Sequence, residues 1–134
     1  MRGMSYMFSG CSSWRELNLS NFKTENVIYM NSMFSECSLL KELDVSNLNT
    51  NNATSMALMF SRCSSLVELD LSNFKTNNLK YMLGMFSNFS SLKKLNISNF
   101  IINDENIIYM FVFIIERNNL FWWIEKQNRK FEII

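Results

Sequence analysis

The sequence predicts an α/β repeat solenoid of 26-residue units, with a parallel sheet on one face and short helical or irregular returns on the other. The first observation is the period, because the Met-Phe pairs that begin at positions 7, 33, 59 and 85 are each 26 residues apart. The second observation is that the apolar spacing changes within each copy from a period of two to a period of three or four. A fixed period of this length is typical of supersecondary units that stack on one another.

Short strands are expected where leucine alternates with polar residues, at 17–19, 43–45, 69–71 and 95–97. In the second copy, Leu43 and Val45 flank Asp44, which is the alternation of a half-buried strand. Met30, Met33, Phe34 and Cys37 follow at steps of three and four in the same copy, which favours one face of a short helix. A Ser-Asn pair follows each expected strand, and Thr and Asn come after it. These residues indicate a turn between the strand and the next helical segment.

The periodic part divides the chain into two predicted regions. Residues 1–100 are expected to form about four repeats, of which the first begins part-way through the pattern. Residues 101–134 lose the cysteine, the Ser-Asn turn and the regular leucines. They are interpreted either as a degenerate repeat that forms a C-terminal cap or as a partly disordered, aggregation-prone stretch.

Composition argues against several functional classes. The 134 residues have a formal net charge of +1, so nothing favours nucleic acid or an anionic membrane surface. Histidine is absent, which removes the commonest general base and zinc ligand. Glycine-rich phosphate loops and nucleophile elbows are also absent. We predict that the protein is not an enzyme and has no catalytic residues, cofactor or metal site.

Three cysteines share one position of the repeat, Cys11, Cys37 and Cys63, and Phe89 holds that position in the fourth copy. Since an aromatic ring is accepted there, we predict buried thiols rather than a disulfide framework. The first eleven residues do not form a signal peptide, and the apolar run at 107–115 is too short to span a bilayer. We therefore expect no membrane insertion, and localisation is undetermined by the sequence.

The alternation of the strands places a second set of residues on the opposite, exposed face of the sheet. Ladders of polar side chains would form there, and an extended face of this kind suits proteins or polymers. An alternative interpretation is a solvated face with no dedicated partner. The candidate partner-binding residues are Glu16, Asn18, Ser20, Glu42, Asp44, Ser46, Glu68, Asp70, Ser72, Lys94, Asn96 and Ser98.

The combination MF-x-x-C-S-x-L-x-x-L-D-L-S-N-F-x-T-x-N matches the leucine-rich-repeat pattern and resembles the BspA-like leucine-rich-repeat surface proteins between Met4 and about Phe100. The resemblance implies a cell-surface or secreted protein that contacts host or matrix proteins. One departure is that apolar residues hold the usual place of the asparagine ladder, so we expect an apolar spine there. These residues are Phe22, Leu48, Phe74 and Phe100.

The expected function is a non-catalytic protein-recognition or adhesion module. Two alternatives are a purely structural repeat fragment of a longer array and an intracellular protein-binding repeat module. Since the first copy begins inside the pattern, self-association through an uncapped N-terminal edge is a further expectation.

Overall fold

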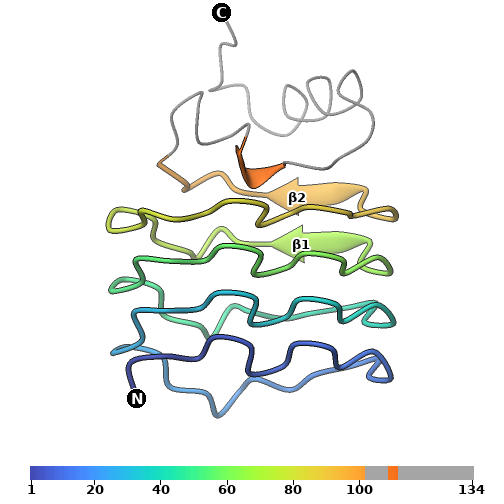
Figure 1. Ribbon diagram of the computed structural model, residues 1–134, viewed down its shortest axis with the longest axis horizontal. Coiled ribbons are helices and arrows are strands. Elements are labelled where there is room, and N and C mark those ends of the chain that lie inside the picture. The colour runs from blue at the N-terminus through green and yellow to red at the C-terminus, as the bar shows by residue number, and fades with distance from the viewer. Residues whose placement is uncertain (102–108, 112–134) are drawn as a thin grey trace, which may run out of the picture.

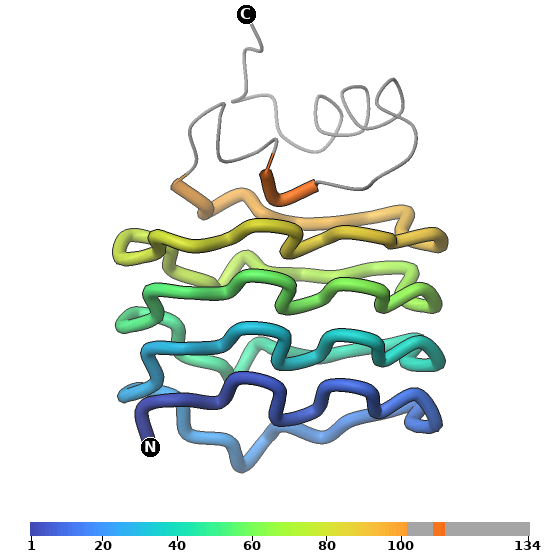
Figure 2. The backbone as a smooth tube through the Cα atoms, viewed as in Figure 1, coloured from blue at the N-terminus to red at the C-terminus, as the bar shows by residue number. Residues whose placement is uncertain are grey.

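The computed structural model describes residues 1–101 and 109–111. The chain runs through successive layers that lie one on another, with the N-terminal layer at one end (Figure 1). Figure 2 shows the same path, in which segments far apart in the sequence run side by side. Parallel bridges join Gly3 to Tyr29, Tyr29 to Ser55 and Ser55 to Tyr81, so neighbouring layers are offset by 26 residues. We name these layers one to four: residues 3–28, 29–54, 55–80 and 81–101.

Two strands are present among the described residues, β1 at Glu68–Asp70 and β2 at Lys94–Asn96. They pair in parallel, with Leu69 opposite Leu95. Both leucines are buried, and the residues that flank them point to the other face. The alternation of apolar and polar residues therefore has the structural effect expected of a strand.

The Met-Phe segment of each layer is a series of turns whose peptide groups bond in two directions. In layer two, the Phe34 N–H donates to the Met59 carbonyl of layer three at 2.9 Å. The Ser35 N–H instead donates to the Ser32 carbonyl within its own layer at 3.1 Å. This alternation recurs from layer one to layer three, so every second peptide group in the segment links two layers.

Two positions in each of these segments have positive φ angles, which suit the third residue of a type II turn. A left-handed residue also interrupts a right-handed helix. The first position has φ angles of 54° to 62° and the second has φ angles of 58° to 73°. The residues are Tyr6, Ser32, Leu58 and Gly84 at the first, and Gly10, Glu36, Arg62 and Asn88 at the second.

The predicted fold class, an α/β repeat solenoid of leucine-rich-repeat type, is wrong for the described residues. Turns replace the expected helical returns, and of the described residues only Tyr109 and Met110 have helical backbone. The expected strands at 17–19 and 43–45 do not form, which leaves one small sheet of two three-residue strands in the described part. The physical reason is that N–H groups which a helix would use internally bond to the next layer instead.

The core consists of columns of equivalent side chains from successive layers. Phe8, Phe34, Phe60 and Phe86 form one column, with ring centroids 5.6, 5.6 and 6.1 Å apart and nearly parallel planes. The predicted burial of the methionine, phenylalanine and leucine columns is confirmed in layers two and three. In layer one, Met7 is 39% exposed. Stacked aromatic rings contribute beyond their buried area, so this column adds to the stability of the stack.

Asparagine side chains form a second set of links, which the sequence analysis did not expect. Asn47 Nδ2 lies 3.2, 2.9 and 3.1 Å from three carbonyl oxygens of layer one. Asn73 repeats this arrangement with layer two at 3.1 Å for each contact. The expected apolar spine also exists, since Phe74 and Phe100 are buried and stack. Expecting the spine in place of an asparagine ladder was therefore wrong, because the chain has both.

Most of the predicted C-terminal region, 101–134, lies outside the described residues, so the cap prediction is not tested. The described residues 109–111 contact layer four. Gly84 donates its N–H to the Tyr109 carbonyl at 2.7 Å, and the Phe111 ring centroid lies 5.3 Å from that of Phe86. The bonding between layers therefore continues past layer four.

Candidate functional site

The predicted recognition face comprises two main columns of polar side chains beside the strands. In the first column, Glu16, Glu42, Glu68 and Lys94 are all exposed. The register of β1 and β2 places Glu68 directly opposite Lys94. The structure thus brings these four residues into one row across the layers, with three acids followed by a base.

The second column, Asn18, Asp44, Asp70 and Asn96, has a structural role that sequence reasoning missed. Each side-chain oxygen accepts the backbone N–H of the serine two residues later, at 2.8 to 3.1 Å. These bonds close the turn after the strand, as short Asn and Asp side chains commonly do. The signal was present in the sequence as Asn or Asp two residues before serine. The serines are Ser20, Ser46, Ser72 and Ser98.

The turn bonds also favour the charged form of the two aspartates. Hydrogen bonds from the side chain and the backbone of Ser46 lower the pKa of Asp44. Ser72 lowers the pKa of Asp70 in the same way, with smaller contributions from Asn96 and Lys94. Hydrogen bonds to the charged form favour it, so both carboxylates are ionised at neutral pH.

The carboxylates of this face have no ion-pair partner in the part of the chain that the structure describes. There, a single salt bridge joins Arg62 to Glu36 at 3.0 Å. Within the same residues, no group of three or more His, Cys, Asp or Glu side chains could hold a metal ion. The face therefore carries separate, solvated charges.

Burial explains the chemistry of the thiols. Cys37 and Cys63 are buried and free, as predicted, and each Sγ donates to a carbonyl oxygen of the preceding layer at 3.1 Å. Burial, followed by the neighbouring thiol, raises the pKa of Cys37 to about 11 and that of Cys63 to about 12. Cys11 is only half-buried. Thiols with such high pKa values are poor nucleophiles at neutral pH.

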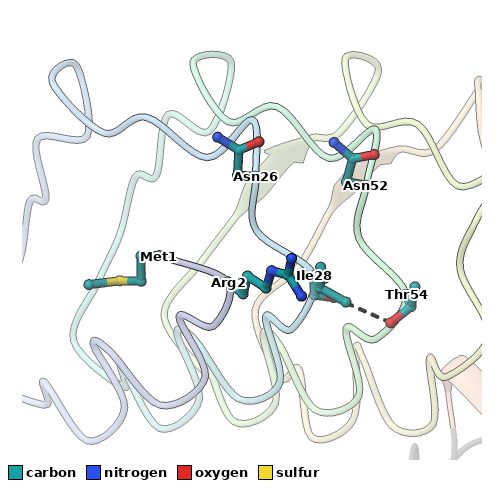
Figure 3. Close-up of a pocket in the computed structure, with 6 residues that line it drawn as sticks. All are labelled: Met1, Arg2, Asn26, Ile28, Asn52 and Thr54. Atoms are coloured by element: carbon teal, nitrogen blue, oxygen red, sulfur yellow. Dashed lines mark hydrogen bonds between the residues drawn. The ribbon is translucent and has the colours of Figure 1, made fainter.

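A groove lined by both polar and apolar residues lies away from the recognition face and was not predicted. Its volume is about 580 Å³, and Met1, Arg2, Asn26, Ile28, Asn52 and Thr54 line it. In the view of Figure 3, the two asparagines lie on one side of the groove and Arg2, Ile28 and Thr54 on the other. Sequence reasoning missed it because its walls combine residues of layers one and two with the two residues that precede layer one. Only the 26-residue spacing of Asn26 and Asn52 could have indicated it.

Among the described residues, no helix has the length and apolar character needed to cross a membrane.

The described residues thus form layers joined by backbone bonds, with columns of polar side chains on an exposed face. The chain belongs to the family described as "Mycoplasma protein of unknown function, DUF285", whose model matches residues 2–120. The predicted membership of the BspA-like leucine-rich-repeat family is therefore wrong. Comparison with curated proteins gave no significant match, and neither did comparison with solved structures.

Proposed function

We propose that the protein is a non-catalytic protein-recognition module that binds a basic segment of a partner protein through its polar face. One observation carries the proposal. In layers two and three, Glu42, Asp44, Glu68 and Asp70 are all exposed, and none forms an ion pair within the described residues. Carboxylates that are free of internal ion pairs can attract and orient a cationic partner.

The turn bonds support this proposal because they hold two of the four carboxylates in place. Asp44 and Asp70 each accept a backbone N–H, at 2.9 and 2.8 Å. A side chain that is already fixed loses less conformational entropy on binding. The acidic surface is therefore preorganised by the same contacts that close the turns.

The acidic part of the face ends before layer four. In layer four, Lys94 and Asn96 replace the acids of the two columns. The partner's basic residues would accordingly match layers one to three, and a basic residue next to Lys94 would be repelled. This asymmetry gives the interface a preferred direction.

The structure suggests variants that remove the charge and keep the fold. Glu42→Lys and Glu68→Lys introduce the residue that layer four carries naturally in that column. Asp44→Asn and Asp70→Asn preserve the turn bond, because Asn18 makes the same bond at 2.9 Å. Binding of a labelled oligolysine peptide, as a minimal basic partner, is measured by fluorescence anisotropy at low and physiological salt.

A double variant outside the recognition face, Glu25→Lys with Glu36→Lys, changes the net charge equally and serves as the control. Its unfolding midpoint is measured as well, because Glu36 forms a salt bridge with Arg62. We expect Glu42→Lys with Glu68→Lys to weaken binding at least tenfold more than the control does, on the order of 1.4 kcal/mol. Equal losses in the two doubles would mean that only net charge matters and would contradict the proposal. They would favour the alternative in which the layers serve as a spacer.

Other parts of the sequence-based hypothesis stay predictions. These are adhesion to host or matrix proteins, a cell-surface or secreted location as opposed to an intracellular one, and self-association through the N-terminal edge. The last is measured directly by light scattering of the purified chain.

A further inference from the structure

We propose that the groove between Arg2 and the two asparagines binds an acidic sugar, a ligand that carries a carboxylate beside several hydroxyl groups. The groove has a volume of about 580 Å³, which lies within the range of small-molecule sites. It is therefore large enough for one sugar ring. This site is separate from the recognition face and does not depend on the function proposed for that face.

Arg2 is suited to hold the carboxylate. None of the six lining residues is acidic, and within the described residues Arg2 has no ion-pair partner. A guanidinium presents a planar set of donors that can bind both oxygens of a carboxylate. Within the described residues, no acidic side chain therefore pairs with the Arg2 guanidinium in the groove.

The opposite side is suited to hydroxyl groups. Asn26 makes no hydrogen bond within the described part of the chain, so its donors and its acceptor are all available. Asn52 donates Nδ2 to the Glu25 carbonyl at 2.7 Å, which fixes the side chain and leaves its oxygen free. Amides and hydroxyls both donate and accept, so these groups can pair with neighbouring sugar hydroxyls. Ile28 adds an apolar contact for the ring.

The backbone argues against a peptide in this groove. The Ile28 N–H donates to the Arg2 carbonyl at 2.7 Å, and the Thr54 N–H donates to the Ile28 carbonyl at 2.9 Å. These bonds join the layers and use the groups that an added strand would need. The groove therefore offers side-chain amides, a hydroxyl and a guanidinium, a set that favours a sugar acid over an extended chain.

The test is a titration of the full chain with glucuronate, followed by the NMR shifts of the asparagine side-chain amides and the Arg2 Nε–H. We expect glucuronate to saturate these shifts in the millimolar range, with glucose and acetate at least about tenfold weaker. Equal binding of acetate and glucuronate would overturn the proposal in favour of a simple anion site. Tighter binding of a tri-glutamate peptide would overturn it in favour of a peptide groove.

Two variants test whether glucuronate binds in the groove. Arg2→Gln should weaken glucuronate about tenfold and leave glucose unchanged, whereas Asn26→Ala should weaken both. Arg15→Gln and Asn21→Ala are matched controls at exposed positions that do not line the groove. Unfolding midpoints confirm that all four variants fold. If Arg2→Gln binds glucuronate as well as Arg15→Gln does, the site assignment is wrong.

Discussion

The asparagine links between layers allow a graded test of what stabilises the stack. Three asparagines at equivalent positions differ in their contacts with a preceding layer, and Asn21 serves as the reference because it lies in layer one and has no preceding layer to contact. Asn73 Nδ2 contacts three carbonyl oxygens at 3.1 Å, Asn99 Nδ2 contacts one at 2.6 Å, and Asn21 contacts none. An amide nitrogen has two hydrogens, so three contacts amount to about two full hydrogen bonds.

Alanine at position 73 should therefore lower the free energy of unfolding by about 2 kcal/mol, at about 1 kcal/mol for each bond. The expected loss is about 1 kcal/mol for Asn99→Ala and within about 0.5 kcal/mol for Asn21→Ala. Urea unfolding followed by circular dichroism measures all three values. A loss for Asn21→Ala as large as that for Asn73→Ala would refute the reasoning, since the effect would then be independent of the bonds between layers.

Three further predictions concern single positions. Gly84→Ala should destabilise more than Gly10→Ala in thermal unfolding, because an added Cβ lies 2.8 Å from a leucine methyl at position 84 and meets nothing within 4 Å at position 10. Because the pKa of Asp44 is lowered in the folded protein, the ionised carboxylate stabilises the fold at neutral pH, and this stabilisation is lost as the pH falls through the pKa that Asp44 has in the folded state. Asp44→Asn should therefore flatten this part of the acid unfolding curve. At about pH 8, iodoacetamide should modify Cys11 first and leave Cys63 intact, since burial raises the pKa of Cys63 to about 12. Peptide mass spectrometry of the treated protein shows which cysteines are modified.

The sequence predicted which residues are buried in the core better than it predicted the conformation of the backbone. Equivalent positions carry equivalent apolar residues, and burial of Met33, Phe34 and Cys37 follows from that identity alone. The same spacing of three and four was interpreted as a helix, because helices and consecutive turns both place such residues on one side. The left-handed positions give no warning in layer three, since Leu58 and Arg62 are not residues that favour positive φ; only Gly10, Gly84 and Asn88, at the same positions of layers one and four, are typical of such a conformation.

The candidate site was predicted only in part. Alternation in the strands placed the exposed glutamates and aspartates on one face, but the bond that the Ser46 N–H donates to the Asp44 carboxylate is a local contact that a column pattern does not reveal. The groove depended on how residues 1–2, layer one and layer two are placed relative to each other. Its residues, such as Arg2 and Thr54, are 52 positions apart in the chain, and no motif connects them.

The turn segments have a consequence for the electric field of the molecule. The peptide group between Tyr29 and Met30 accepts a bond from Met4 and donates one to Ser55, and three other peptide groups of layer two bridge their neighbours in the same sense. Peptide dipoles linked head to tail in this way add, as they do along a helix. Four such rows run parallel in the Met-Phe segments, so the dipoles of these segments add, with their negative ends toward layer one. The row that contains the Ile28 and Thr54 N–H groups donates toward the N-terminal end of the stack instead and therefore opposes them.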